Sequence, residues 1–389
     1  MFARRTGWQS TSNRFTLALE ERRRSGQEAL DLTESNPTRC GFRYPEALLD
    51  RLRDARALAY APEAQGMPAA REAIRDYYRE SGAELASEQL FLTTSTSEGY
   101  SWVFRLLCDP GDEVLIPAPS YPLFEYLASI QDVAPVRYPL FYDHGWHVDV
   151  HALEQALTPQ ARAILVVSPN NPTGSYLREE ELAQMNRLCA DRGLALVVDE
   201  VFLDFALDGR RHASLARNRE ALTFTLSGLS KIAALPQMKV AWIAVTGPER
   251  VAQEARQRLE IIADTYLSMS TPSQLATPGW LESRHPVQAE IRERIADNLA
   301  TLDAAIAKAP AVERLEVEGG WYAVLRVPRT ASDEELAIAL LQEQGVVVHP
   351  GHFYDFPTEG YLVASLITPT KAFAIGSERL AEALSRRFR

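Results

Sequence analysis

Short apolar runs alternate with longer amphipathic stretches through the middle of the chain. The apolar runs cover residues 90–93, 113–116, 133–138, 163–167, 195–198, 222–226 and 240–245. Helical patterns separate several of these runs, for example at residues 97–107 and 178–191. Continuously apolar strands joined by helices are typical of a parallel sheet that is buried on both faces. The pattern therefore predicts an α/β fold with a mostly parallel sheet covered by helices on both faces.

The two ends of the chain have a different pattern. Residues 14–30 read as one charged helix, and further long helical patterns cover residues 249–265 and 290–308. Near the C-terminus, strand patterns at residues 320–327, 346–349 and 362–367 mix with helical patterns at residues 332–344 and 371–387. We therefore predict a large domain from residues 45–285. A smaller α+β domain would be built from residues 1–44 and 286–389.

Composition excludes some classes of function. The chain has 389 residues and a formal net charge of -11, which argues against a nucleic-acid-binding protein. Its three cysteines lie far apart, so they predict no metal site and fit a reduced, cytoplasmic compartment. The start of the chain has no apolar run behind its positive charges, and no apolar stretch of 18 residues occurs. We expect neither a signal peptide nor a membrane span.

A lysine follows one of the predicted strands in surroundings that look buried. The segment reads Ser227-Gly-Leu-Ser-Lys231-Ile-Ala-Ala-Leu-Pro. A lone Lys in a loop is usually a solvated surface group, but burial disfavours the ammonium form and so favours a reactive amine. The segment resembles the Ser-x-x-Lys segment of the fold-type I pyridoxal-phosphate (PLP) enzymes, in particular the class I/II aminotransferases. That resemblance implies that Lys231 holds the cofactor as a Schiff base.

Two further polar residues follow predicted strands. Asp199 ends an apolar run and begins Asp-Glu-Val-Phe, which resembles the family's Asp-Glu-Val-Tyr. The resemblance implies that Asp199 meets the pyridine nitrogen of PLP, whereas a strand-end Asp can also simply cap a turn. Asn171 lies in Ser168-Pro-Asn-Asn-Pro-Thr-Gly174, which is similar to the family's Asn-Pro-x-Gly segment. Its amide would donate to the phenolic oxygen; the alternative is a plain Asn-Pro turn.

The phosphate of PLP needs donors at the start of a helix. Thr93-Thr-Ser-Thr-Ser97 lies between a predicted strand and a predicted helix, and the resemblance places Ser95, Thr96 and Ser97 at the phosphate. Read alone, this run is a helix N-cap. Ser230 would add a hydroxyl. Lys239 stands where the family commonly has a phosphate-binding Arg, eight residues after the Schiff-base Lys.

Two tyrosines complete the resemblance. Tyr121, in Pro119-Ser-Tyr-Pro122, resembles the residue that stacks on the pyridine ring. Tyr60 is similar to a Tyr that reaches the phosphate in the partner subunit, so the resemblance implies a homodimer. A core Tyr, or for Tyr60 a surface Tyr, is the alternative for each. The matches occur in family order from Tyr60 to Lys231.

Two positions depart from the family pattern. Phe202 replaces a Tyr that normally gives the phenolic oxygen a second donor. The strand Gly360-Tyr-Leu-Val-Ala-Ser365 has Val363 where the family has the Arg that binds the substrate carboxylate. A buried carboxylate needs a partner, so another cation must serve or the substrate is unusual. The sequence does not choose among Arg39, Arg43, His349, His352 and Lys371.

The N-terminal segment Asp31-Leu-Thr-Glu-Ser-Asn-Pro-Thr38 resembles one that closes over the substrate carboxylate in the family. Asn36 and Arg39 are therefore the candidate substrate-binding residues, although Asn36 equally fits an Asn-Pro turn.

The resemblance predicts a PLP-dependent aminotransferase that moves an amino group between an amino acid and a 2-oxo acid. A PLP-dependent lyase or decarboxylase of the same fold is the first alternative, because the Tyr and the Arg are missing. A non-catalytic homologue is the second, although the retention of Lys231, Asp199 and Asn171 argues against it. A nicotinamide enzyme is disfavoured because no strand is followed by Gly-x-Gly-x-x-Gly.

Overall fold

The computed structural model describes residues 1–8, 12–267 and 269–388. Its centre is an eight-stranded sheet with the order β2-β9-β8-β7-β6-β3-β4-β5. The strands are β2 (Leu90–Thr93), β3 (Glu113–Ala118), β4 (Ala134–Tyr142), β5 (Trp146–Val148), β6 (Ala161–Val167), β7 (Ala195–Asp199), β8 (Thr223–Gly228) and β9 (Ala241–Thr246). The run from β8 through β7, β6 and β3 to β4 is parallel. Strand β9 is antiparallel to both β2 and β8, and β5 is antiparallel to β4.

Successive residues of the central strands enter two different apolar clusters, because side chains alternate across a sheet. In β7, Ala195 and Val197 belong to the cluster covered by α4 and α9. Leu196 and Val198 belong to the cluster covered by α6 and α7. Both faces of the sheet are therefore covered, as the apolar runs predict.

The helices around this sheet are α3 (Pro68–Glu80), α4 (Thr96–Leu107), α5 (Phe124–Ser129), α6 (Val150–Ala156), α7 (Glu179–Arg192), α8 (Leu229–Ile232), α9 (Glu249–Tyr266) and α10 (Thr271–Glu282). Short 3-10 turns are η1 (Arg4–Thr6), η2 (Pro37–Arg39), η3 (Ala55–Leu58), η4 (Ser87–Gln89), η5 (Leu215–Arg217), η6 (Pro236–Met238) and η7 (Gly351–Tyr354). In the described part of the chain, no helix is both long and apolar enough to cross a membrane.

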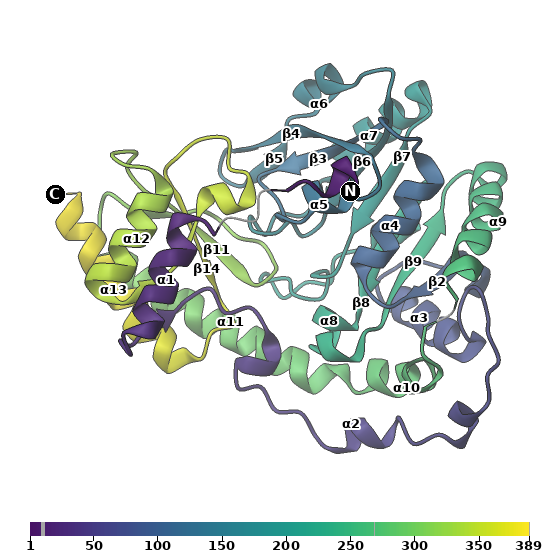
Figure 1. Cartoon of the computed structure of the whole chain (residues 1–389), viewed down its shortest axis with the longest axis horizontal. Coiled ribbons are helices and arrows are strands. Elements are labelled where there is room, and N and C mark those ends of the chain that lie inside the picture. The colour runs from purple at the N-terminus through teal and green to yellow at the C-terminus, as the bar shows by residue number, and fades with distance from the viewer. Residues whose placement is uncertain (9–11, 268, 389) are drawn as a thin grey trace.

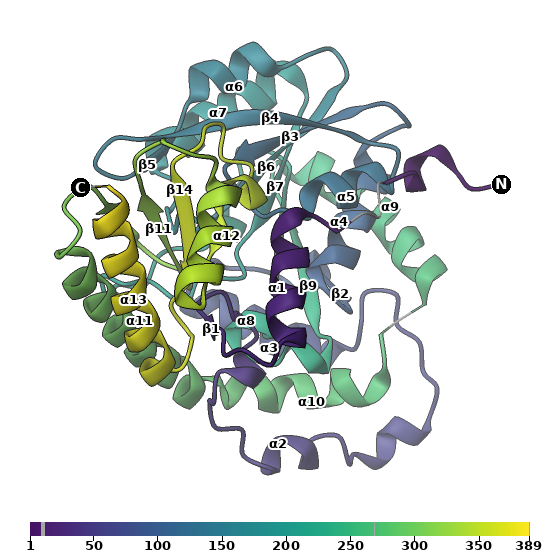
Figure 2. The same ribbon diagram turned by 60° about the vertical axis from the view of Figure 1, so that its left-hand side comes forward.

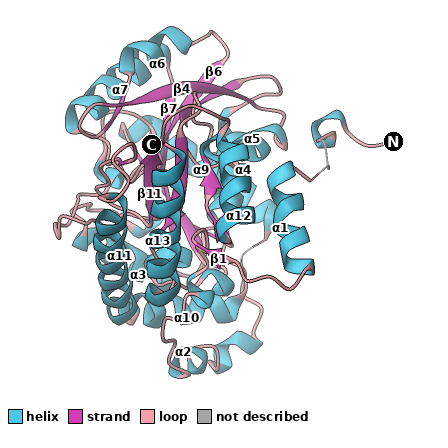
Figure 3. Ribbon diagram, turned by 90° about the vertical axis from the view of Figure 1, so that its left-hand side faces the viewer, coloured by secondary structure: helices cyan, strands magenta, loops and turns pink. Residues whose placement is uncertain are grey.

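A smaller antiparallel sheet with the order β10-β11-β14-β13 lies to one side. Its strands are β10 (Glu313–Arg314), β11 (Tyr322–Arg326), β13 (His349–Pro350) and β14 (Tyr361–Ser365). The helices near it are α1 (Arg14–Arg24), α11 (Arg284–Ile306), α12 (Asp333–Gln344) and α13 (Thr370–Arg387). Figure 1 shows purple α1 beside yellow-green α12, and Figure 3 shows α11 and α13 running alongside each other.

Both chain ends contribute to this smaller α+β part. Strand β1 (Leu30–Asp31) pairs in parallel with β12 (Val346–Val347), which joins the N-terminal segment to the C-terminal region. The predicted fold class is confirmed, whereas the division at residues 44/45 and 285/286 stays a prediction. The first helix is shorter than the sequence predicts. It ends at Arg24, because Gly26 takes a left-handed conformation with φ 71°.

One segment extends away from the rest of the molecule. The connection from Arg43 to Gly66 contains α2 (Ala47–Asp50) and loops below the body in Figure 2. It exposes large apolar side chains, including Leu58 at 92% and Tyr60 at 75% of their full accessible surface. Exposure of large apolar side chains next to one another is uncommon on a surface that stays in water.

Candidate active site

A cavity of about 290 Å³ lies at the carboxyl edge of the parallel strands, where ligands bind in α/β sheets. The predicted residues that line it are Ser95, Thr96, Ser97, Tyr121, Asn171, Asp199, Ser230 and Lys231. They come from connections that follow β2, β3, β6, β7 and β8. Since these connections leave the same edge of the sheet, residues far apart in the sequence meet in one place.

Lys231 lies on α8, the short helix that directly follows β8. Leu229 and Ile232 of this helix are completely buried and hold it against the core. The Nζ atom of Lys231 lies 4.8 Å from the ring centre of Trp321 and 5.3 Å from that of Phe202. Burial lowers the pKa of Lys231 to about 8, although the Asp199 carboxylate opposes this shift. About a tenth of this amine is therefore neutral and nucleophilic at pH 7, far more than for an ordinary lysine.

Asp199 ends β7 and is 7% exposed. Its Oδ2 accepts a hydrogen bond of 2.9 Å from the Tyr100 hydroxyl, and its Oδ1 accepts one of 3.0 Å from the backbone N–H of Val201. Burial raises the pKa of Asp199, while these two donors and Lys231 oppose the shift. A buried carboxylate held in one orientation by two donors is suited to pairing with a cationic group.

Two adjacent asparagines in the turn after β6 behave differently. Both N–H donors of the Asn170 side chain have partners within the protein. They donate to Pro119 O at 3.1 Å and to Thr173 Oγ1 at 2.9 Å. Asn171 lines the cavity, and its buried Oδ1 has no hydrogen-bond partner. Buried polar atoms are normally paired. An unpaired buried carbonyl oxygen calls for a hydrogen-bond donor, so the side chain of Asn171 keeps unused hydrogen-bonding capacity at the cavity.

The start of α4 forms another wall of the cavity. Ser95 is its N-cap, and the Ser95 Oγ accepts a hydrogen bond of 3.2 Å from the Glu98 N–H. Thr96 and Ser97 form the first turn, where backbone N–H groups lack helical partners and favour anions. Across the cavity, a Cβ at Gly228 would come within 2.8 Å of the Val240 carbonyl oxygen and the Ala241 Cβ. Only a glycine allows the backbone to pass this closely.

Four of the predicted residues do not line the cavity. Tyr60 lies on the exposed segment around α2. Lys239 is exposed, and it follows η6 in a left-handed conformation. The Asn36 side chain caps η2 by accepting from the Thr38 N–H at 3.1 Å, and Arg39 is exposed with a guanidinium 4.0 Å from Glu34. Ser35, next to Asn36, lines the cavity in their place.

Three residues that the sequence analysis did not single out also form the site. Tyr100 binds Asp199, Trp321 faces Lys231, and Tyr322 lines the cavity. Trp321 and Tyr322 follow Gly319-Gly320, and an unusual Gly-Gly before two aromatic residues is a signal that could have marked them. Nothing in the local sequence marks Tyr100, because it looks like any core residue of a helix.

This set of groups matches the functional groups of PLP. An amine, a buried carboxylate, an unpaired amide and a helix start meet in one cavity, and they can address its aldehyde, ring nitrogen, phenolic oxygen and phosphate respectively. Comparison with known families agrees, since the model "Aminotransferase class I and II" matches residues 30–369.

The chain belongs to the class I and II aminotransferases. It is a PLP-dependent enzyme of fold type I that transfers amino groups, and members of the family act on amino acids and 2-oxo acids. The sequence-based predictions of family, cofactor and reaction are confirmed.

The aminotransferase is similar to several characterised relatives. It is 28% identical to the alanine aminotransferase of Mycobacterium bovis over 92% of this chain and 86% of that protein. It is 27% identical to the aspartate/prephenate aminotransferase of Thermus thermophilus over 94% of each chain. Its fold is shared with an alanine aminotransferase from Pyrococcus furiosus, with a TM-score of 0.90, 22% identity and full coverage of both chains.

The position of the missing carboxylate-binding Arg is well defined in the aminotransferase. Val363 is 1% exposed in β14 and lies opposite Val324 of β11 and His349 of β13. Arg43 is exposed and lies 3.9 Å from Glu290, and His352 and Lys371 are also exposed. In the described residues, the cavity lining contains no Arg or His, and Lys231 is its one basic residue.

Proposed function

We propose that the aminotransferase carries out its reaction in this cavity, with Lys231 and Asp199 as the catalytic residues. The observation that carries the proposal is the meeting of the buried Lys231 amine, the Asp199 carboxylate and the unpaired Asn171 amide at one edge of the sheet. Bound PLP supplies an aldehyde that condenses with amines and a ring that withdraws electrons from the substrate Cα.

Lys231 is the proposed base and acid at the substrate Cα. Its amine would remove the Cα proton and deliver it to the former aldehyde carbon of the cofactor, and removal requires a neutral amine near neutral pH. The pKa of about 8 that burial gives Lys231 supports this role. Trp321 and Phe202 cover the amine and keep water from competing with it.

Asp199 would hold a proton on the ring nitrogen by placing a negative charge beside it. Tyr100 and the Val201 N–H fix the carboxylate, and burial strengthens its attraction for a cation. The Asn171 side chain would bind the phenolic oxygen, and Tyr121, which is 37% exposed at the cavity wall, would cover one face of the ring.

The phosphate would lie at the start of α4. Ser95, Thr96 and Ser97 supply hydroxyls and helix N-terminal N–H groups there, and Ser230 lies on the same cavity wall as Lys231. Lys239 lies outside the lining, so it would act on the phosphate only through longer-range attraction.

The substrates we propose are an amino acid and a 2-oxo acid that exchange the amino group. The relatives support this class without choosing a pair, because they are named for alanine in one case and for aspartate and prephenate in another. A panel of amino donors would define the pair.

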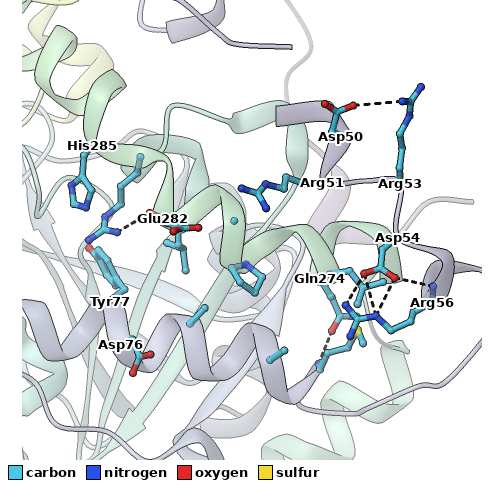
Figure 4. A pocket seen from close by; sticks show the side chains of 18 of the residues that line it. Asp50, Arg51, Arg53, Asp54, Arg56, Asp76, Tyr77, Gln274, Glu282 and His285 are labelled. Atoms are coloured by element: carbon cyan, nitrogen blue, oxygen red, sulfur yellow. Dashed lines mark hydrogen bonds and ion pairs between the residues drawn. The ribbon is translucent and has the colours of Figure 1, made fainter. Parts of the chain in front are cut away.

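We also propose that the aminotransferase is a homodimer. The segment around α2 exposes Leu49, Leu58 and Tyr60, which a second copy could cover. Figure 4 shows the groove of about 830 Å³ beneath this segment, where Asp50 pairs with Arg53 and Asp54 pairs with Arg56. Tyr60 would then reach the partner's cavity. Light scattering of the wild type and of Leu58→Asp tests this, and a monomeric wild type would contradict it.

An absorbance spectrum of the purified protein tests the reaction itself. We expect a visible band from PLP bound to Lys231, and a mixture of amino acids should convert it into the band of the aminated cofactor. Bound PLP that no amino donor converts would contradict transamination and favour a lyase or decarboxylase.

A further inference from the structure

The small-domain wall of the cavity is formed by the antiparallel strands β11 and β14 with β13 beside them. Tyr322 pairs with Ser365 and Val324 pairs with Val363, so these four side chains project from the same face. On the other edge of β14, His349 of β13 lies opposite Val363. Tyr322 lines the cavity, and the other residues of this face lie next to it on the sheet, outside the lining.

Neutral hydrogen-bonding groups gather at and next to this wall, where Ser35 and Tyr322 line the cavity and Tyr354 and His349 lie outside the lining. The Tyr354 hydroxyl and His349 Nδ1 lie 3.0 Å apart, and the rings of Tyr322 and Tyr354 are 6.2 Å apart. Ser35 lies beside the Tyr322 hydroxyl and also lines the cavity. Burial lowers the pKa of His349 to about 4, so its imidazole is neutral at pH 7. We call Ser35, Tyr322, Tyr354 and His349 the neutral cluster.

The charged groups next to the neutral cluster are mainly acidic. Burial raises the pKa of Tyr322, and the nearby Glu34 adds to this shift. Burial lowers the pKa of His349, and the nearby Asp31 opposes that shift. Acidic side chains disfavour a second anion nearby.

Arg294, which lies beside Cys40 and Ile367, is bound to other partners. Arg294 donates to the carbonyl oxygens of Cys40 and Ile367 at 3.0 Å and 3.3 Å, and its guanidinium lies 4.9 Å from the ring centre of Phe42. This arrangement uses the charge of Arg294 to support the backbone around Cys40. The described lining of the cavity therefore offers a carboxylate no guanidinium.

We propose that the neutral cluster recognises the substrate's Cα substituent through uncharged hydrogen bonds, so that the enzyme accepts a neutral carboxyl derivative, such as an amide, at least as well as a carboxylate. This inference rests on the proposed function of the cavity. A tyrosine hydroxyl can donate to a carboxylate and can also donate to, or accept from, an amide. A guanidinium would instead favour the carboxylate by a bidentate, charge-assisted pair. The enzyme's substrate class therefore extends to amino compounds whose carboxyl group is masked.

Two probes that react with PLP whatever the natural substrate make the test direct. Aminooxyacetate carries a carboxylate, and aminooxyacetamide differs from it by a neutral amide. Both condense with the cofactor aldehyde, and loss of the visible band gives the rate. For the wild-type holoenzyme we expect the acid-to-amide rate ratio to be about one or below. A ratio of about ten or more, the gain expected from a charged partner, would overturn the proposal. A cation would then reach the carboxylate from elsewhere, the partner subunit included.

A substitution that restores the charge sharpens the result. Val363→Arg should raise the rate with aminooxyacetate by about tenfold or more while leaving the amide rate nearly unchanged. Val251→Arg on the exposed surface of α9 is the matched control, and it should change neither rate. Thermal unfolding shows whether Val363→Arg folds, because the site is buried. If it does not fold, the wild-type ratio alone decides.

An equilibrium measurement is independent of the condensation rate. Propionate and propionamide cannot condense with the cofactor, so the shift of the unfolding midpoint that each causes reports binding alone. We expect propionamide to shift the wild-type midpoint at least as far as propionate does. A larger shift with propionate would count against the neutral cluster. Failure of the proposed function looks different, because then no amino donor, acid or amide, would convert the cofactor.

Discussion

The two walls of the cavity differ in what they offer a ligand. The large-domain wall presents the Lys231 amine and the Asp199 carboxylate at the ends of parallel strands. The small-domain wall presents Tyr322 and, next to it on the sheet, Val363 where the family carries an Arg. The large-domain wall is thus matched to PLP, which every member of the family shares, and the small-domain wall to a substrate that differs between members.

The physical basis of the difference is the type of sheet. Strand ends in the parallel sheet all converge on one edge, so a polar residue there is already directed at the ligand. The antiparallel small-domain sheet presents one side-chain face, on which neighbours such as Val324, Val363 and His349 decide the chemistry together. One substitution on this face can remove the charge without disturbing the cofactor.

Removing the amine should have the largest effect on the large-domain wall. Lys231→Ala should slow conversion of the cofactor by amino donors at least about 1,000-fold, because no other described basic residue lines the cavity. Stopped-flow absorbance measures this. Lys308→Ala, which removes an exposed lysine near Glu378, is the control and should keep the wild-type rate. Loss of less than tenfold would contradict the role of Lys231.

Neutralising the carboxylate should have the next largest effect. Asp199→Asn should slow amino transfer by about 100- to 4,000-fold, since breaking a buried ion pair costs about 3–5 kcal/mol. Single-turnover rates and the dissociation constant for PLP provide the measurement.

Asp204→Asn is the matched control for Asp199→Asn. Asp204 lies on the connection after β7, which Asp199 begins, but it does not line the cavity. Its carboxylate accepts a hydrogen bond of 2.6 Å from Gln288. Asp204→Asn should change the free energy of unfolding while leaving the rate at which amino donors convert the cofactor nearly unchanged. If both variants lost the same amount of amino-transfer rate, the structure of the connection, rather than the charge of Asp199, would determine the rate.

The rate at which the apoprotein captures PLP should depend on pH through Lys231. Because burial lowers its pKa to about 8, the neutral amine increases about tenfold per pH unit below that value and is nearly complete above it. Capture followed by absorbance should therefore rise steeply from pH 6 to 8 and level off above. A rise that continued unchanged to pH 10 would show that the Lys231 amine keeps its ordinary pKa.

The smallest predicted effect concerns the small-domain wall. The folded-state pKa of His349 is about 4, below its value in the unfolded chain, so the unfolded state binds more protons between about pH 6.5 and 4. The stability contributed by neutral His349 is present above pH 6.5 and is lost as the pH falls. His349→Gln should flatten this loss by roughly 2 kcal/mol. Denaturant unfolding at pH 7 and pH 5 measures it, and equal slopes in variant and wild type would refute it.

The local sequence predicted the fold class and the strand-end residues of the large-domain wall. Continuously apolar strands, each followed by a polar turn, place Asp199, Asn171 and Lys231 at or just after the strand ends without knowledge of the rest. The structure brings these residues to one cavity because the strands are parallel and adjacent.

The tertiary structure alone decided the small-domain wall. Arg39 and Asn36 were candidates by position in the sequence, but the structure directs them away and brings Ser35 and Tyr322 to the cavity. Tyr100 reached Asp199 through the packing of α4, which no local pattern encodes. The end of a strand is determined by residues that are neighbours in the sequence, so it can be predicted locally. The partner that a side chain meets across the cavity is determined by long-range packing, so it cannot.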